Sequence, residues 1–135
     1  MKKLFTLSII AMLISSCGKI HTPNAESEKL FGKWRFVQSY GGFAGTGDPS
    51  FDSTITYEYK ENGSFFHRKD GQLINQMNFS LQLGESIYSQ DEQLLINYGG
   101  GMFTQYLSHS YQVNNDTLIL NEEVYDGFQY IFVKQ

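Results

Sequence analysis

The feature that most constrains this chain is the alternation of apolar and polar residues between closely spaced turn signals. The pattern is clearest in Gln72–Leu83, where apolar residues occupy the odd positions and polar residues the even ones, with Ile74 and Asn75 as exceptions. A strand with this pattern has one dry face and one wet face. Asn-Gly at Asn62 and Asp-Gly at Asp70 are signals for tight hairpin turns. The chain therefore predicts antiparallel strands joined by hairpins.

Similar segments follow one another along the chain, with turn signals about every 8 to 12 residues. The other expected strands are Lys33–Tyr40, Ser53–Lys60, Ser64–Arg68, Glu85–Ser89, Gln93–Tyr98, Phe103–Val113, Thr117–Leu120 and Gly127–Lys134. No segment has a helical period of useful length, and Ala25–Phe31 has room for two helical turns at most.

Eight or nine such strands form a meander, which either closes into a barrel or folds over as a sandwich. Closure removes the exposed sheet edges. The expected fold class is therefore all-β, an antiparallel up-and-down β-barrel of about eight strands. In its first strand, the alternation places Trp34, Phe36 and Tyr40 on one face, and Arg35 and Ser39 on the other.

The N-terminal segment is set apart from this fold. Two lysines precede an apolar run, Leu4–Ile14, which is shorter than the roughly 20 residues that a membrane-spanning helix needs. Two serines then precede Cys17, an arrangement that resembles a bacterial lipobox. The resemblance implies a signal peptide over 1–16 and a lipid anchor on Cys17. The polar segment that follows contains Pro23 and has no apolar period, which predicts a flexible tether over 17–29, and the strand pattern places the barrel domain over 30–135.

Charge and polar residues argue against several classes of function. A net charge of −4 provides no basic face for nucleic acid. In the domain, His67 is expected at a solvated strand end. His109 is expected to face inward, either as a polar group that contacts a ligand or as a hydrogen-bonded core histidine. Glu122, Glu123 and Asp126 do not have the spacing of a calcium loop and indicate a solvated hairpin. We therefore expect no enzyme activity, no metal and no cofactor.

The stretch LFGKWRFV, Leu30–Val37, resembles the Gly-x-Trp entry of lipocalins and of lipocalin-like lipoproteins of Bacteroidetes. The stretches GGFAGTG, YEYKENGSF, NNDTLIL and DGFQYIF are also similar to that group. In the family, the tryptophan sits at the closed end of the barrel under a basic side chain from near the chain's end. The resemblance gives these roles to Trp34 and Lys134, where lipocalins usually have an arginine.

A barrel of eight strands is either filled by its own side chains or holds one small ligand. Both readings stay open, because many of the inward side chains are bulky. The candidate ligand-lining residues are Phe36, Tyr57, Tyr59, Phe79, His109 and Tyr111. The loop 41–52 occupies the place of the lipocalin lid, and it is either a mobile gate or an ordered crossover with glycines in tight turns. Its candidate lid residues are Gly41, Gly42, Phe43, Gly45, Gly47 and Phe51.

The resemblance implies a monomeric, envelope-anchored lipoprotein that binds a small hydrophobic molecule against an aromatic interior. The alternative is a filled barrel that contacts proteins, or has a structural role in the envelope, through its loops or outer wall. No acidic cluster follows Cys17, and by comparison with the same group this favours the periplasmic side of the outer membrane over the cell surface.

Overall fold

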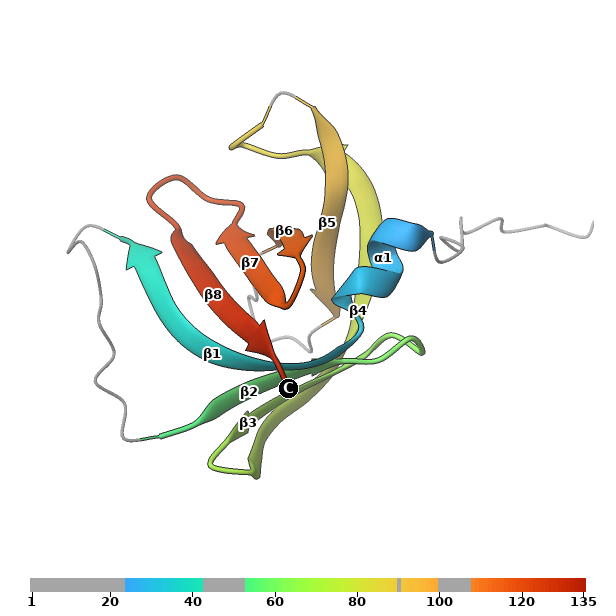
Figure 1. The fold of residues 1–135 in the computed structure, drawn as a ribbon. Helices are drawn as coiled ribbons and strands as arrows, with labels where there is room; N and C mark the ends of the chain where they lie inside the picture. The colour runs from blue at the N-terminus through green and yellow to red at the C-terminus, as the bar shows by residue number, and fades with distance from the viewer. Residues whose placement is uncertain (1–23, 43–52, 90, 100–107) are drawn as a thin grey trace, which may run out of the picture.

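The computed structural model describes residues 24–42, 53–89, 91–99 and 108–135. The elements in these ranges are α1 (Ala25–Leu30), β1 (Gly32–Gly41), β2 (Ile55–Tyr59), β3 (Ser64–Lys69), β4 (Gln72–Glu85), β5 (Glu92–Gly99), β6 (His109–Asn114), β7 (Thr117–Glu122) and β8 (Phe128–Lys134). Each strand pairs antiparallel with the next, and β8 pairs with β1, so the strands form a closed barrel (Figure 1). The expected all-β barrel is confirmed, and the sandwich is excluded.

A β-bulge at Val37 divides β1 into two halves. Phe36 pairs with Phe132 of β8, and Gln38 pairs with the adjacent residue Ile131, so Val37 has no partner on β8. The extra residue shifts the alternation by one position, so Ser39 faces the interior and Tyr40 faces outward with 38% of its surface exposed. The expectation that Tyr40 shares a face with Phe36 was wrong, because nothing in the sequence marks the bulge.

A second bulge, at Ile74, explains the two exceptions in the alternating pattern of β4. His67 pairs with Asn75, and Arg68 pairs with Leu73, so Ile74 has no partner residue on β3. The side chain of Asn75 therefore faces the interior beside His67. Leu73 is displaced to the outer face, where 53% of its surface is exposed.

The predicted strand Glu85–Ser89 is not a strand. β4 runs unbroken to Glu85, and the chain then turns over Ser86–Ser89 before β5. This long strand serves two neighbours, because Asn78 pairs with β3 on one side and with β5 on the other. β6 begins at His109, and residues 103–107 of the strand predicted there lie outside the described residues.

The helix α1 begins with a reciprocal capping box. The Ser27 amide donates to Asn24 Oδ1 at 2.9 Å, and the Asn24 amide donates to Ser27 Oγ at 2.8 Å. Leu30, at the end of α1, is completely buried against the barrel. Residues 25–29, the last residues of the predicted flexible tether, are therefore helical. Within the described ranges, no helix is long and apolar enough to span a membrane.

The hydrophobic core fills the part of the barrel next to α1. Trp34 Nε1 donates a hydrogen bond of 2.7 Å to the Leu30 carbonyl, which joins the core to the helix. The buried residues of the core are Leu30, Trp34, Tyr59, Phe65, Met77, Phe79, Leu94, Ile96, Tyr111, Leu118, Leu120 and Phe132. This end of the barrel is therefore packed with side chains.

Candidate functional site

Inward-facing rings continue along the barrel beyond this core, on the strand residues farther from α1. They lie toward the end of the barrel that β1 reaches as it runs away from α1, a direction that Figure 1 shows. We call them the aromatic belt: Phe36, Tyr57, His67, Tyr98, His109 and Tyr130. All six are half-buried. Phe132, two positions along β8 from Tyr130 and on the same face, is only 1% exposed. The belt therefore marks the level at which the interior stops being fully packed.

Five of the six belt rings and two core rings form a closed circuit of aromatic contacts, and His67 adjoins this circuit at Tyr57. Phe36 lies 6.5 Å from Tyr130 between ring centroids, Tyr130 lies 6.1 Å from His109, and His109 lies 5.5 Å from Tyr98. The circuit returns through the core, by way of Phe65 and Phe132, to Tyr57 and Phe36. All seven contacts of the circuit are tilted or edge-to-face, and aromatic quadrupoles favour such arrangements over a face-to-face sandwich.

The phenol groups near the belt are held neutral. Tyr130 Oη donates to Glu122 Oε1 at 2.7 Å, and Tyr59 Oη and Tyr98 Oη share a hydrogen bond of 2.7 Å. Burial, followed by the hydrogen bond to Glu122, raises the pKa of Tyr130 above its usual value of 10.0. Burial, followed by the interaction with Tyr98, raises the pKa of Tyr59 well above that value.

His67 also faces the interior, contrary to the solvated strand end that the sequence suggested. Its ring centroid lies 5.0 Å from that of Tyr57, edge to face. Its paired residue on β4 is Asn75, which also faces the interior. Burial lowers the pKa of His67 from 6.5, so its imidazole is neutral at pH 7. The belt therefore offers apolar ring faces with neutral polar groups between them.

The rim beyond the belt is shaped by close backbone packing. Gly41 and Gly42 adopt φ angles of 104° and 74°, which other residues rarely adopt. A Cβ on Gly42 would lie 2.5 Å from the ring of Phe128, so this ring fits directly against the glycine. The amide of Phe128 donates to Glu122 Oε2 at 3.0 Å, and Glu122 thus joins the rim to the belt. The other candidate lid residues, Phe43, Gly45, Gly47 and Phe51, lie outside the described residues.

The structure divides the candidate ligand-lining residues among three environments. Phe36, Tyr57 and His109 belong to the belt. Tyr59 and Phe79 lie in the packed core, 0% and 8% exposed. Tyr111 points away from the belt to α1, where its hydroxyl donates to the Glu26 carbonyl at 3.3 Å.

Sequence reasoning missed three belt residues, His67, Tyr98 and Tyr130. A signal was present for all three, because Tyr98 follows the apolar Ile96 at a spacing of two, and Tyr130 precedes Phe132 at the same spacing. His67 stands two positions after Phe65 in the same way. Its charged neighbours Arg68 and Lys69 obscured this alternation.

Trp34 and Lys134 lie together at the packed end of the barrel. The two residues pair across β1 and β8, and Lys134 Nζ lies 5.4 Å from the centroid of the Trp34 ring. This is within the range of a cation–π contact. Cys17, the predicted lipid anchor, lies outside the described residues.

The fold and the belt define a class of protein: a small closed antiparallel β-barrel with one packed end and a partly exposed aromatic interior toward the other. The described part of the chain contains no group of three or more histidine, cysteine, aspartate or glutamate residues placed to hold a metal ion. No family model, no curated protein and no solved structure matches this chain.

Proposed function

We propose that this protein binds a small, mostly apolar molecule at the aromatic belt. The observation that carries the proposal is the partial exposure of six rings that face the inside of a closed barrel. A completely filled barrel would bury them as it buries Phe132. Covering such rings with an apolar ligand removes their surface from water, at about 25 cal/mol per Å² of apolar area.

The polar groups of the belt narrow the class of ligand. His67 is neutral, and the phenol of Tyr130 is held protonated beside the Glu122 carboxylate. A carboxylate at this position repels an anionic head group. A neutral molecule that accepts or donates one or two hydrogen bonds therefore suits the belt better than a fatty acid does.

The experiment that tests the proposal is native mass spectrometry of the protein purified from its own host, before and after organic extraction. A single adduct mass that extraction removes supports a carrier and gives the mass of the ligand. An apo mass, together with no binding of an apolar fluorescent probe, contradicts it.

A matched pair of variants localises the binding. Tyr130→Ala removes a belt ring, and Tyr125→Ala removes a ring that is 90% exposed on the β7–β8 connection. We expect Tyr130→Ala to weaken probe binding at least about fivefold, because an aromatic contact contributes about 1 kcal/mol beyond the area it buries. Tyr125→Ala should leave binding unchanged, and circular dichroism checks that both variants fold.

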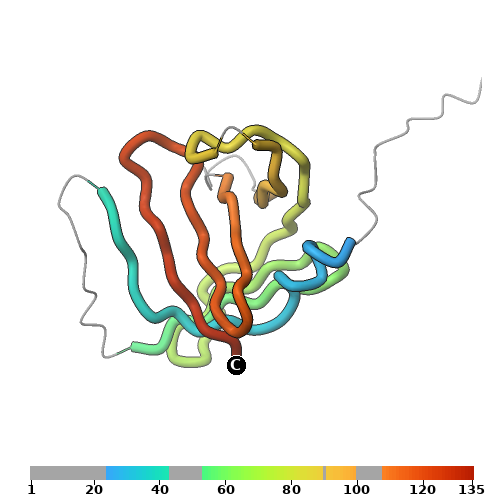
Figure 2. Tube along the Cα trace, turned by 45° about the horizontal axis from the view of Figure 1, so that its top comes forward, coloured from blue at the N-terminus to red at the C-terminus, as the bar shows by residue number. Residues whose placement is uncertain are grey.

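A second candidate function, a filled barrel that contacts another protein, is favoured by a separate observation. The β4–β5 and β7–β8 connections lie side by side (Figure 2), because the Glu123 carboxylate accepts hydrogen bonds of 2.8 Å from Ser86 Oγ and the Ile87 amide. These connections expose Ile87, Tyr88 and Tyr125 by 44%, 54% and 90%. An apolar patch of this kind is typical of a contact surface.

We further propose that the protein is a monomeric lipoprotein of the outer membrane, anchored through Cys17 and facing the periplasm. The support is the N-terminal pattern of lysines, apolar run and small residues before the cysteine. Cys17→Ala should move the protein from the membrane fraction to the soluble fraction and abolish labelling by a fatty-acid analogue. Retention of the label would contradict the anchor.

A further inference from the structure

The seam between β5 and β6 has fewer paired residues than any of the other seven seams of the barrel. These strands pair only at Leu95 with Ser110 and at Ile96 with His109, whereas β6 pairs with β7 along its whole length. Beyond His109 and Ser110, β6 has a strand neighbour on one side only among the described residues. Its residues 111–114 therefore present an edge, as do residues 92–94 of β5.

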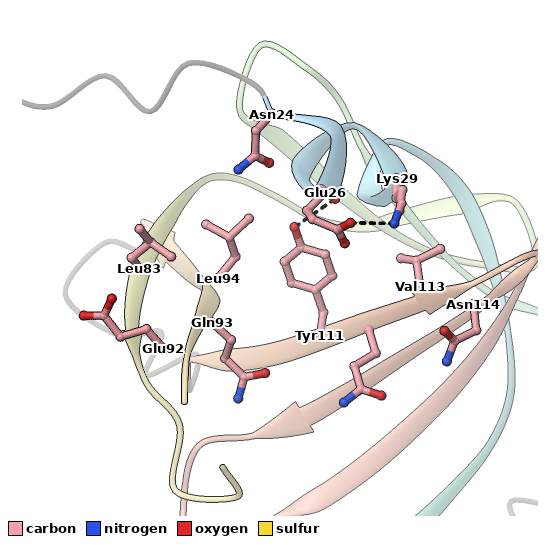
Figure 3. Close-up of a pocket in the computed structure, with 11 residues that line it drawn as sticks. Asn24, Glu26, Lys29, Leu83, Glu92, Gln93, Leu94, Tyr111, Val113 and Asn114 are labelled. Carbon is pink, nitrogen blue, oxygen red and sulfur yellow. Dashed lines mark hydrogen bonds and ion pairs between the residues drawn. The ribbon is translucent and has the colours of Figure 1, made fainter. Parts of the chain in front are cut away.

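A groove of about 440 Å³ lies between these two edges and α1 (Figure 3). Its lining includes consecutive residues of both strands, 92–94 of β5 and 111–114 of β6. Successive side chains of a strand point to opposite faces of a sheet. Residues that follow one another directly can therefore line the same hollow only where it borders the edge of the strand.

The two ends of the groove carry opposite charges. Glu92 lies at one end of the groove, near Leu83 and Leu94. It is paired directly with Glu85 across the β4–β5 hairpin. Two carboxylates placed opposite each other repel, and neither forms an ion pair within the described ranges. At the other end, a second hollow of about 490 Å³ shares Lys29, Val113 and Asn114 with the groove and is also lined by Lys134. Lys29 pairs with Glu26 of the same groove at 2.6 Å, so Lys134 is the cation of this end without a carboxylate partner among the described residues.

We infer that this groove binds an extended peptide, which adds as a strand to the free edge of β6. Main-chain hydrogen bonds to an exposed edge give such complexes their affinity, and alternate side-chain contacts give their specificity. The charges select a peptide with a basic residue toward Glu92, an acidic residue toward Lys29 and Lys134, where it competes with Glu26 for Lys29, and an apolar residue between them, against Leu94. The site is separate from the aromatic belt.

The test uses the whole protein and a blocked pentapeptide, acetyl-Lys-Thr-Val-Thr-Glu-amide, measured by calorimetry and by amide chemical shifts in NMR. We expect saturable binding that shifts and protects amides of residues 111–114. The same peptide with alternate amides N-methylated should bind at least tenfold more weakly, because it cannot form the ladder. Equal binding of the two peptides would overturn strand addition.

A matched pair of charge reversals locates the peptide. Lys29→Glu alters the groove, and Lys33→Glu makes the same change of net charge on the exposed outer side of β1. We expect Lys29→Glu to weaken peptide binding about tenfold and Lys33→Glu to change it less than twofold. Equal effects, no saturable binding, or saturable binding of a neutral oligosaccharide but not of the peptide would each overturn the inference.

Discussion

Tyr130 donates a hydrogen bond of 2.7 Å to Glu122, and this contact joins the belt of the barrel to its rim. The other oxygen of the same carboxylate accepts the Phe128 amide at 3.0 Å. The Glu122 side chain of β7 therefore binds β8 at two residues, Phe128 and Tyr130.

The variant Glu122→Ala is expected to lower the free energy of unfolding by about 1–3 kcal/mol, because it removes the acceptor of both hydrogen bonds. Glu122→Gln keeps an acceptor and should cost less. The measurement is urea denaturation followed by circular dichroism. Equal losses for the two variants would show that the hydrogen bonds contribute nothing beyond the charge. In Glu122→Gln the pKa of Tyr130 should also fall, yet stay raised, because burial is its larger cause.

Gly41 tests the close packing of the rim. A Cβ at this position would lie 2.6 Å from the Gly127 carbonyl oxygen, in addition to the strain of a φ of 104°. Gly71 has a φ of 79° with nothing within 4 Å of such a Cβ, so it isolates the strain. We expect Gly71→Ala to cost roughly 1–2 kcal/mol. Gly41→Ala should cost roughly 1–3 kcal/mol more. Equal melting temperatures for the two variants would contradict the packing argument.

The contact between Lys134 and Trp34 is open to a spectroscopic test, because Trp34 is the single tryptophan of the chain. Lys134→Met keeps the apolar stem and removes the charge, and it should cost about 0.5–1 kcal/mol. Lys134→Arg should retain the stability. The measurement is thermal unfolding followed by tryptophan fluorescence, with Lys33→Met as the control for a lost surface charge. Identical shifts for Lys134→Met and Lys33→Met would rule out the cation–π contribution.

The stability of the fold should fall in alkaline solution. Burial, and then the charge of Glu26, raises the pKa of Tyr111 from 10.0 to about 12. Above pH 10 the unfolded chain releases this proton while the folded protein keeps it, so the free energy of unfolding decreases between pH 10 and 12. Tyr111→Phe should make this decrease shallower in denaturation curves taken from pH 9 to 11.5. A decrease of unchanged steepness would show that other tyrosines account for it.

The barrel could be predicted because alternation and turn residues are local signals. The bulges at Val37 and Ile74 could not, since one inserted residue reverses the faces that follow without any special residue to mark it. The belt was found only in part for a different reason. A period of two tells which face a side chain occupies but not its height along the barrel axis. Tyr59 and Tyr57 share a face, yet only Tyr59 is fully buried.

The helix α1 illustrates a third limit. Its six residues are too few to show a helical period, and its apolar contribution is the single residue Leu30. The capping box formed by Asn24 and Ser27 was nevertheless present in the sequence as a pair of capping residues three positions apart. Local capping chemistry therefore carried information that periodicity did not.

The pairing of β1 with β8 has a kinetic consequence. This pairing joins the first and the last strand of the barrel, which lie farthest apart along the chain. Its loop closure therefore has the largest entropic cost of any seam. The hairpins β2–β3, β3–β4, β4–β5, β6–β7 and β7–β8 can form from neighbouring residues, while the β1–β8 seam must wait until the two ends of the meander meet. Folding should therefore be slow for a domain of this size, with a transition state in which the curved sheet has formed but has not yet closed on itself.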